Sequence, residues 1–263
     1  MTQPSEDPRA LFDAIGEIYD RARPRYPEAL FDDLLRESGV GPESFLLEIG
    51  CGTGIATLPV AARGHFLLGL EPAPRLVELL WQKLSAYPAV TILETTFEAW
   101  EGRPGLFDLV YCAQAFHWLD PVRRYAKAAE QLRPGATLAI IGRNYLLVDA
   151  ELGRAFDRLY ATHAPSATPT SKTMWYAQDG PIPGELADSG HFDRIRTFHY
   201  PERTRYATDA YRALLESFSD HQRLAPDARA RLLDGVCETV ERFGGEVEVD
   251  YDANLFLANR CEG

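Results

Sequence analysis

The chain of 263 residues is 46% hydrophobic and 25% charged, a composition typical of a protein with a packed globular core. Its formal net charge of −12 repels nucleic-acid phosphates and anionic membrane surfaces, so we expect neither as a partner. No apolar run approaches the ~20 residues of a membrane span, and the first eight residues lack the zones of a signal peptide. The four scattered cysteines form no C-x-x-C pair. These features predict a cytoplasmic protein with free thiols and no bound metal.

The first 44 residues predict two helices. Apolar side chains at helical spacing, among them Leu11 and Ile15, indicate a helix over 9–20. Pro24 and Pro27 then impose an extended turn, and Pro27 can open a second helix as its first residue. That helix should end near position 36, before the glycine-containing turn at 39–42.

Residues 45–142 alternate between strand-like and helix-like segments. We expect strands at 45–49, 66–70, 91–93, 107–113 and 137–141, and helices at 55–62, 75–86 and 121–132. Strands that alternate with helices at this spacing form a parallel sheet with right-handed crossovers. The segment therefore predicts the core of a Rossmann-like, doubly wound α/β fold.

The rhythm breaks over residues 143–191. Two helix-like stretches and a run rich in Pro, Thr, Ser and Gly at 164–190 predict a helical insertion over the ligand edge of the sheet. Residues 192–201 and 246–258 then alternate like strands, with helices at 207–218 and 226–242 between them. Residues 192–263 are thus expected to complete a mostly parallel, seven-stranded sheet.

A glycine-rich turn follows the first predicted strand. Gly50, Gly52 and Gly54 let the backbone turn tightly and lie close to a ligand, and the helix that follows presents free N–H groups. Dinucleotide-binding enzymes use the pattern G-x-G-x-x-G, but its last glycine would fall at Ile55. The observed pattern is acidic-x-G-x-G-x-G, which a turn without any ligand could also contain.

The second predicted strand ends at Glu71, about twenty residues past the glycines. An acidic side chain at this place accepts hydrogen bonds from the ribose hydroxyls of an adenosine ligand. Glu71 alone would indicate only a solvated charge. Together with the glycine turn at this spacing, it predicts a nucleoside site.

At this point the sequence resembles the class I S-adenosylmethionine-dependent methyltransferases. The resemblance is to the small-molecule, methyltransferase type 11 branch that includes trans-aconitate methyltransferase-like proteins. It rests on the order and spacing of residues 19–27, 48–54, 71, 96–98, 107–110, 114–120 and 132–135. Residues 143–263 match the family only in general layout. The family implies S-adenosylmethionine as cofactor, S-adenosylhomocysteine as product, and a small-molecule methyl acceptor.

The resemblance also implies a set of cofactor-binding residues. These are Tyr19, Arg23, Glu48, Gly50, Cys51, Gly52, Gly54, Glu71, Pro72, Thr96, Phe97, Glu98, Gln114, Ala115 and Trp118. The glycines would pass under the methionine and ribose, Glu48 would lie near the methionine amino group, and Glu71 would hold the ribose. Residues 96–98 would flank the adenine, although many relatives have Asp where this chain has Thr96. Residues 1–44 would form a helical lid, with Tyr19 and Arg23 closing over the methionine.

His117 and Trp118 follow the fourth predicted strand, where the methyl group should emerge. A neutral imidazole at His117 could remove a proton from the acceptor or orient it, or it could be a structural histidine bonded to the backbone. We favour the structural role, because many methyl transfers need no base. Trp118 is expected to form a wall of the pocket. Tyr145, Trp175 and Tyr176 could line a substrate cavity within the predicted substrate-cap insertion, 143–191.

The sequence leaves two other functions open. A nicotinamide-dependent Rossmann oxidoreductase shares the strand, glycine and acid arrangement, although Ile55 and the block 107–118 argue against it. A protein that binds the cofactor without turnover would have the same motifs. Either a monomer or a homodimer is compatible with the sequence.

Overall fold

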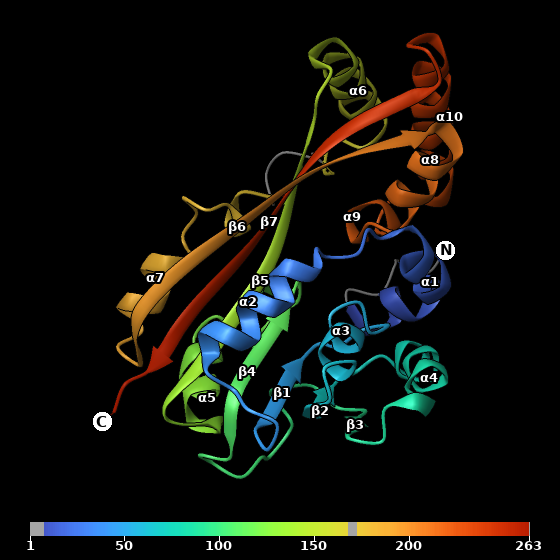
Figure 1. Ribbon diagram of the computed structural model, residues 1–263. Helices are drawn as coiled ribbons and strands as arrows, with labels where there is room; N and C mark the ends of the chain where they lie inside the picture. The colour runs from blue at the N-terminus through green and yellow to red at the C-terminus, as the bar shows by residue number, and fades with distance from the viewer. Residues whose placement is uncertain (1–7, 168–172, 263) are drawn as a thin grey trace. The chain divides into compact units, whose positions relative to one another are not determined.

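The computed structural model describes residues 8–167 and 173–262, and a seven-stranded sheet runs through the chain (Figure 1). Its strands lie in the order β3-β2-β1-β4-β5-β7-β6. Their bounds are β1 Phe45–Ile49, β2 Phe66–Leu70, β3 Val90–Leu93, β4 Phe107–Ala113, β5 Leu132–Leu147, β6 Phe192–Ala207 and β7 Glu246–Arg260. The pairs β2–β3, β1–β2, β1–β4 and β4–β5 are parallel, whereas β7 runs opposite to β5 in Figure 1. The predicted Rossmann-like, mostly parallel seven-stranded fold is confirmed.

Helices follow the strands as a doubly wound fold requires. Their bounds are α1 Pro8–Ala22, α2 Glu28–Ser38, α3 Thr57–Ala61, α4 Pro74–Lys83, α5 Arg124–Gln131, α6 Ala150–His163, α7 Ile182–Asp188, α8 Thr208–Glu216, α9 Ser219–Gln222 and α10 Pro226–Arg242. The described residues also contain three 3₁₀ turns, η1 Leu84–Ala86, η2 Phe116–Trp118 and η3 Thr173–Tyr176. No helix in the described part of the chain is both long and apolar enough to cross a membrane.

The chain divides into two compact units. One contains residues 25–143, 175–200 and 253–263, and we call it the core unit. The other contains residues 1–24, 144–174 and 201–252, of which 1–7 and 168–172 lie outside the described residues; we call it the second unit. Strands β5, β6 and β7 contribute residues to both units.

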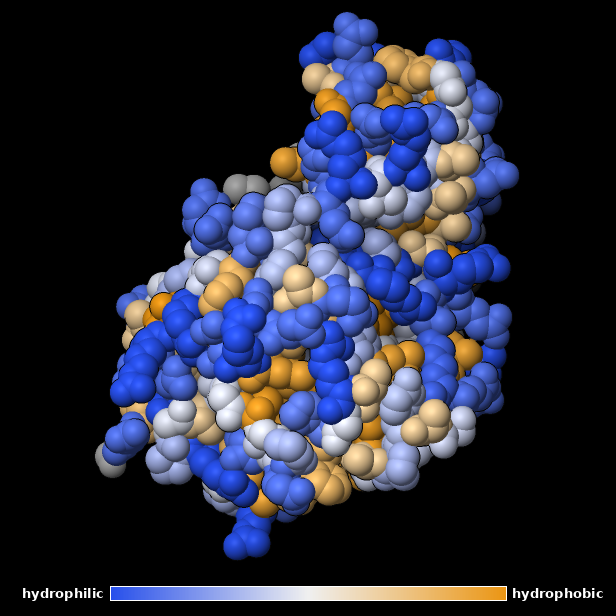
Figure 2. Space-filling model, viewed as in Figure 1, coloured by the Kyte–Doolittle hydropathy of each residue, from blue (hydrophilic) through white to orange (hydrophobic). Residues whose placement is uncertain are grey.

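The core unit buries apolar side chains on both faces of its sheet. Along β1, Leu46 packs with α2 and α3, whereas Leu47 packs with α5, because successive side chains of a strand point to opposite faces. A strand covered on both faces reads as a continuous apolar run, as 45–49 does. On the face shown in Figure 2, hydrophilic side chains predominate and apolar ones appear in separate patches.

The second unit has its own apolar cluster. Helices α6, α8 and α10 contribute Phe156, Leu214 and Val236, and β7 contributes Val247 and Val249. All five side chains are buried. A separate core of this kind explains why these segments form a compact unit.

Two strands, β5 and β6, extend further than the sequence predicts. The sequence predicts that β5 ends at Ile141, but the strand continues to Leu147. It predicts that β6 ends at position 201, but that strand continues to Ala207. Gly142 and Asn144 are poor strand formers, and local propensity therefore predicts the end of β5 before them. In the structure, Tyr145 and Leu147 pack against the apolar cluster of the second unit, and this burial outweighs local propensity.

The two units do not follow the predicted segment boundaries. Residues 25–44, predicted to belong to a lid, lie in the core unit, and so do residues 175–191 of the predicted insertion. The remainder of the insertion, 144–174, belongs to the second unit. The roles of lid and substrate cap for these segments stay predictions.

Candidate functional site

The glycine turn lies at the carboxyl end of β1, next to the ends of β2 and β4. The N–H groups of Gly50 and Cys51 donate to the carbonyl of Leu70, at the end of β2. Gly50, Gly52 and Gly54 have φ of 70°, 55° and 92°, a region that side-chain-bearing residues rarely adopt. The turn therefore needs glycine at these positions for its backbone alone.

The three glycines differ in what an added Cβ atom would meet. A Cβ at Gly50 would lie 2.6 Å from Cβ of Ala115, and one at Gly54 would lie 2.5 Å from Cδ1 of Leu80. A Cβ at Gly52 would meet no atom within 4 Å. Packing against Ala115 therefore requires glycine at position 50, and at Gly54 the end of the Leu80 side chain would have to move. The backbone at Gly52 borders open space in which a ligand can lie close.

Glu71 holds the glycine turn directly. One carboxylate oxygen accepts the N–H of Gly52 at 2.8 Å, and the other accepts the N–H of Ala73 at 3.0 Å. The side chain is only 6% exposed. An ionised carboxylate has about four acceptor positions, so one carboxylate can accept more than two hydrogen bonds. Glu71 and the glycines lie together, as the sequence predicts, and the half-buried Pro72 follows.

Glu48 lies deeper than its motif suggests. Its side chain is 1% exposed, and Tyr111 on β4 donates its hydroxyl hydrogen to the carboxylate at 2.8 Å. Burial raises the pKa of Glu48 to about 7, and the hydrogen bond from Tyr111 partly opposes the rise. Cys51 is also buried, and burial raises the pKa of its thiol well above the usual value. Contact of Glu48 with a ligand stays a prediction.

Gln114 marks the carboxyl end of β4. Its φ is 57°, a left-handed conformation that costs energy for any residue with a side chain. The surrounding bonds maintain it: the backbone N–H donates to Ile141 at 2.9 Å, and Nε2 donates to the carbonyl of Arg143 at 2.9 Å. The turn brings Ala115 against Gly50. Gln114 and Ala115 therefore lie beside the glycine turn.

His117 and Trp118 stand on η2, immediately after Ala115. The His117 side chain is exposed and Trp118 is half-buried, with their ring centroids 4.9 Å apart. Nδ1 of His117 lies 2.8 Å from the hydroxyl oxygen of Tyr176. Tyr176 is only 3% exposed, and the half-buried Trp175 packs beside it. Three aromatic residues that the sequence suggested for substrate binding thus surround His117.

Residues 96–98, which follow β3, contact other residues of the protein. The hydroxyl of Thr96 accepts the N–H of Ala99 at 3.0 Å, and the ring of Phe97 is buried in the core. The exposed Glu98 accepts the backbone N–H of Asp120 at 3.1 Å. Adenine contacts by these residues stay predictions.

Tyr19, Arg23 and Tyr145 gather in the second unit. The Arg23 guanidinium lies 5.0 Å from the Tyr19 ring centroid and 4.4 Å from that of Phe218, and it donates to the carbonyl of Ser217 at 2.9 Å. The ring of Tyr145 packs on Phe218 at 5.3 Å. The predicted lid residues therefore share one aromatic cluster.

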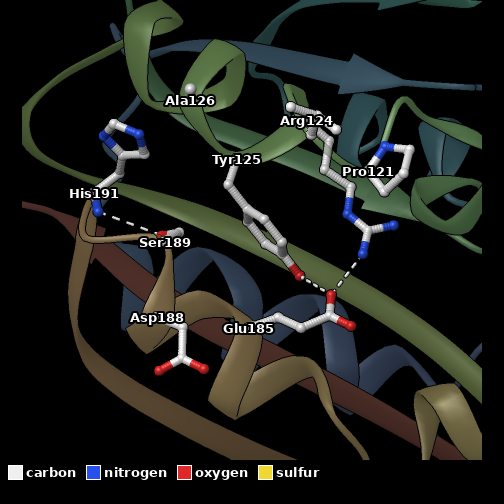
Figure 3. A pocket seen from close by; sticks show the side chains of 9 residues that line it. Pro121, Arg124, Tyr125, Ala126, Glu185, Asp188, Ser189 and His191 are labelled. Carbon is white, nitrogen blue, oxygen red and sulfur yellow. Dashed lines mark hydrogen bonds and ion pairs between the residues drawn. The ribbon is translucent and has the colours of Figure 1, made fainter.

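A polar cluster that the sequence analysis missed lies between α5 and α7. One carboxylate oxygen of Glu185 accepts from Arg124 at 2.5 Å and from the Tyr125 hydroxyl at 2.9 Å, and the other accepts from Trp175 Nε1 at 3.1 Å. Figure 3 shows the side chains of Arg124 and Tyr125 directed at Glu185. The cluster borders a cavity of about 410 Å³. Glu185 stands in a Pro- and Gly-rich stretch without motif, so no sequence signal identified it.

The Arg124 side chain is held tightly in this cluster. It is only 9% exposed, and the rings of Phe116, Tyr125 and Trp175 lie within 5.5 Å of its guanidinium carbon. Among residues 8–167 and 173–262, no group of His, Cys, Asp or Glu side chains is placed to hold a metal ion.

Comparisons with known proteins agree with this geometry. Residues 47–140 match the model of a methyltransferase domain family. An uncharacterized methyltransferase of Mycobacterium tuberculosis is 32% identical over 141 residues, covering 54% of this chain and 55% of that protein. The chain thus spans about half the length of the first curated relatives it matches. An uncharacterized methyltransferase-like protein of Schizosaccharomyces pombe is 25% identical over 92% of both chains.

Solved structures share the fold over most of the chain. A proposed type II methyltransferase from Anaeromyxobacter dehalogenans has a TM-score of 0.64 at 22% identity, covering 92% of this chain and 99% of that one. A phosphoethanolamine N-methyltransferase of Haemonchus contortus, solved with phosphomonomethylethanolamine and S-adenosylhomocysteine, has a TM-score of 0.59 at 15% identity, covering 98% and 61%. Residues 47–140 are therefore similar to a methyltransferase domain, and the fold is one that these solved methyltransferase structures share.

Proposed function

We propose that the chain transfers the methyl group of S-adenosylmethionine, in line, to an O, N or C atom of a small molecule. The observation that carries the proposal is the open space over Gly52 beside the buried carboxylate of Glu71. A backbone without a side chain admits the cofactor closely, and the carboxylate can accept ribose hydroxyls. Both lie at the carboxyl edge of parallel strands, where open α/β sheets bind their ligands.

The residues of the site would act by holding the cofactor and by orienting the methyl acceptor toward it. The sulfonium of the cofactor supplies an already activated methyl group. Gln114, fixed by its bonds to Ile141 and Arg143, would set the position of the reacting end. Alignment of two reactants can lower a barrier by ~7–11 kcal/mol, so orientation accounts for a large part of the rate without acid or base.

The net charge of −12 supports a small-molecule acceptor over nucleic acid. Cys51, Cys112, Cys237 and Cys261 are all free thiols, which fits a reducing cytoplasm. Either a monomer or a homodimer would be compatible with the site.

The test is ligand-induced stabilisation. S-adenosylmethionine and S-adenosylhomocysteine at 100-fold over their dissociation constants should stabilise the protein by ~2.7 kcal/mol, which raises the melting temperature by roughly 5–10 °C. NAD should give no shift, and a shift with NAD alone would favour an oxidoreductase. Stabilisation without methyl transfer to any compound in an acceptor screen would favour binding without turnover.

A pair of glycine variants locates the site. Gly52→Val should abolish the stabilisation by S-adenosylhomocysteine, because the side chain fills the ligand space. Gly64 is a matched control, because its φ is 83° and its Cβ would also meet nothing within 4 Å, but it lies in the turn before β2. Gly64→Val should carry a similar backbone cost and retain the shift. Equal ligand responses in the two variants would place the cofactor elsewhere.

A further inference from the structure

The segment 95–100 begins directly at Glu71, at the carboxyl edge of the sheet. The N–H of Thr95 donates to the backbone carbonyl of Glu71 at 3.2 Å, and the N–H of Glu71 donates to Leu93 at 3.1 Å. The carboxylate of Glu71 accepts the N–H of Gly52, whose backbone borders open space. A ribose held by Glu71 would carry its nucleobase one sugar ring away. The segment 95–100 is therefore within reach of that base.

Lys127 on α5 holds the backbone of this segment. Its Nζ donates to the carbonyl of Glu98 at 2.9 Å and to the carbonyl of Trp100 at 2.8 Å. The same ammonium lies 5.2 Å from the centroid of the Phe97 ring, which is 3% exposed and packs in the core. An ammonium has three donors, and hydrogen bonds from a charged donor are stronger than neutral ones. One side chain thus ties two carbonyls of the segment to α5.

Two further bonds shape the segment. Within it, the N–H of Trp100 donates to the carbonyl of Thr96 at 3.0 Å. The carboxylate of Glu98 accepts the N–H of Asp120 at 3.1 Å, which links the segment to the residues after η2. These bonds form the turn and connect its outer side, whereas Lys127 attaches its carbonyls to a helix of the core unit.

We propose that Lys127 is a positioning residue that holds the segment 95–100 as a fixed wall for the nucleobase of the cofactor and so makes the site selective for adenine. The contact with the nucleobase rests on the proposed function, whereas the attachment of the segment by Lys127 does not. Polar groups fixed in such a wall cannot turn to match another base, so a mismatched base leaves them unpaired. A loosened wall adapts to both bases, and the selectivity falls.

The test compares two ligands by calorimetry on the full chain. One is S-adenosylhomocysteine, and the other is S-inosylhomocysteine, in which a carbonyl oxygen replaces the adenine amino group. The wild-type protein should bind S-adenosylhomocysteine roughly 10-fold or more tightly, because one mismatched buried hydrogen bond costs about that factor. Equal affinities in the wild-type protein would overturn the proposal, whatever the fate of any variant.

Lys127→Met keeps an unbranched side chain over Phe97 and removes the ammonium. The ratio of the two affinities should fall by roughly 5-fold or more, towards equal binding. Lys127→Arg, which keeps a charged donor, should retain the preference for S-adenosylhomocysteine. Arg123→Met is the matched control, because it removes a positive charge from an exposed side chain at the start of α5. It should leave the ratio unchanged. A general loss of stability affects both ligands equally, so it does not change this ratio.

Hydrogen exchange of the backbone amides of 95–100, measured without any ligand, tests the attachment itself. Exchange should be roughly 10-fold faster in Lys127→Met than in the wild-type protein and unchanged in Arg123→Met. An unchanged ratio or unchanged exchange in folded Lys127→Met, or equal changes in the two Met variants, would contradict the role of Lys127. Failure of the methyltransferase proposal would appear instead as absence of stabilisation by S-adenosylhomocysteine, and the exchange measurement would still show whether Lys127 holds the segment.

Discussion

Replacement of Glu48 by Gln should make the protein more stable at alkaline pH, although it removes a charged residue of the glycine-turn motif. The carboxylate is 1% exposed, and a hydroxyl from Tyr111 is its hydrogen-bond donor. A buried ionised group loses its hydration, which hydrogen bonding only partly replaces. Gln has nearly the same shape and can accept the same bond without a charge.

The magnitude follows from the pKa of Glu48, which burial raises from 4.5 to about 7. Between these values the folded state binds more protons than the unfolded state, so stability falls as pH rises from about 4.5 to about 7. Each pKa unit corresponds to 1.36 kcal/mol, so the ionised carboxylate lowers the free energy of unfolding by about 3 kcal/mol above pH 7. Glu48→Gln should not show this loss.

Urea unfolding of both proteins from pH 5 to pH 9 measures the effect. The stability of Glu48→Gln relative to wild type should rise with pH by up to about 3 kcal/mol, since all other titrating groups cancel in the difference. Glu101→Gln, at an exposed position, is the control for the exchange of a carboxylate for an amide. A difference between Glu48→Gln and wild type that does not vary with pH would refute the assignment of a buried, raised carboxyl.

Three further outcomes are expected. Glu71→Ala should weaken S-adenosylhomocysteine binding by ~1.5–3 kcal/mol in calorimetry, and unchanged affinity would exclude Glu71 as ribose ligand. Because the variant also leaves the N–H groups of Gly52 and Ala73 without their carboxylate acceptor, it should lower the free energy of unfolding. Burial lowers the pKa of His221 to about 4, so stability should fall as pH drops from 6.5 towards 4, and His221→Gln should reduce that slope in the same unfolding series. His117→Ala should lower cofactor affinity and stability together while the remaining turnover keeps its pH profile; a ~10²–10⁴-fold loss of turnover with intact binding would instead indicate a base.

The sequence predicts the glycine turn and the position of Glu71 beside it because both signals are local. A glycine that must adopt positive φ, as at Gly52, is visible in the sequence itself, and Glu71 follows at a spacing set by one helix and one strand. The sequence predicts too short a strand β5, because Gly142 and Asn144 have a low propensity for strands. The packing that outweighs them comes from β7 and α10, about a hundred residues later in the chain.

The sequence does not show which side chains surround each site residue, because those neighbours come from distant parts of the chain. A strand covered on both faces gives no periodicity, so nothing in 45–49 indicates that Glu48 lies fully inside and next to Tyr111. His117 was recognised, but its partner Tyr176 stands 59 positions away in a segment without motif. Hydrogen-bond partners determine whether an imidazole donates or accepts, so the chemistry of His117 depends on a contact that only the fold creates.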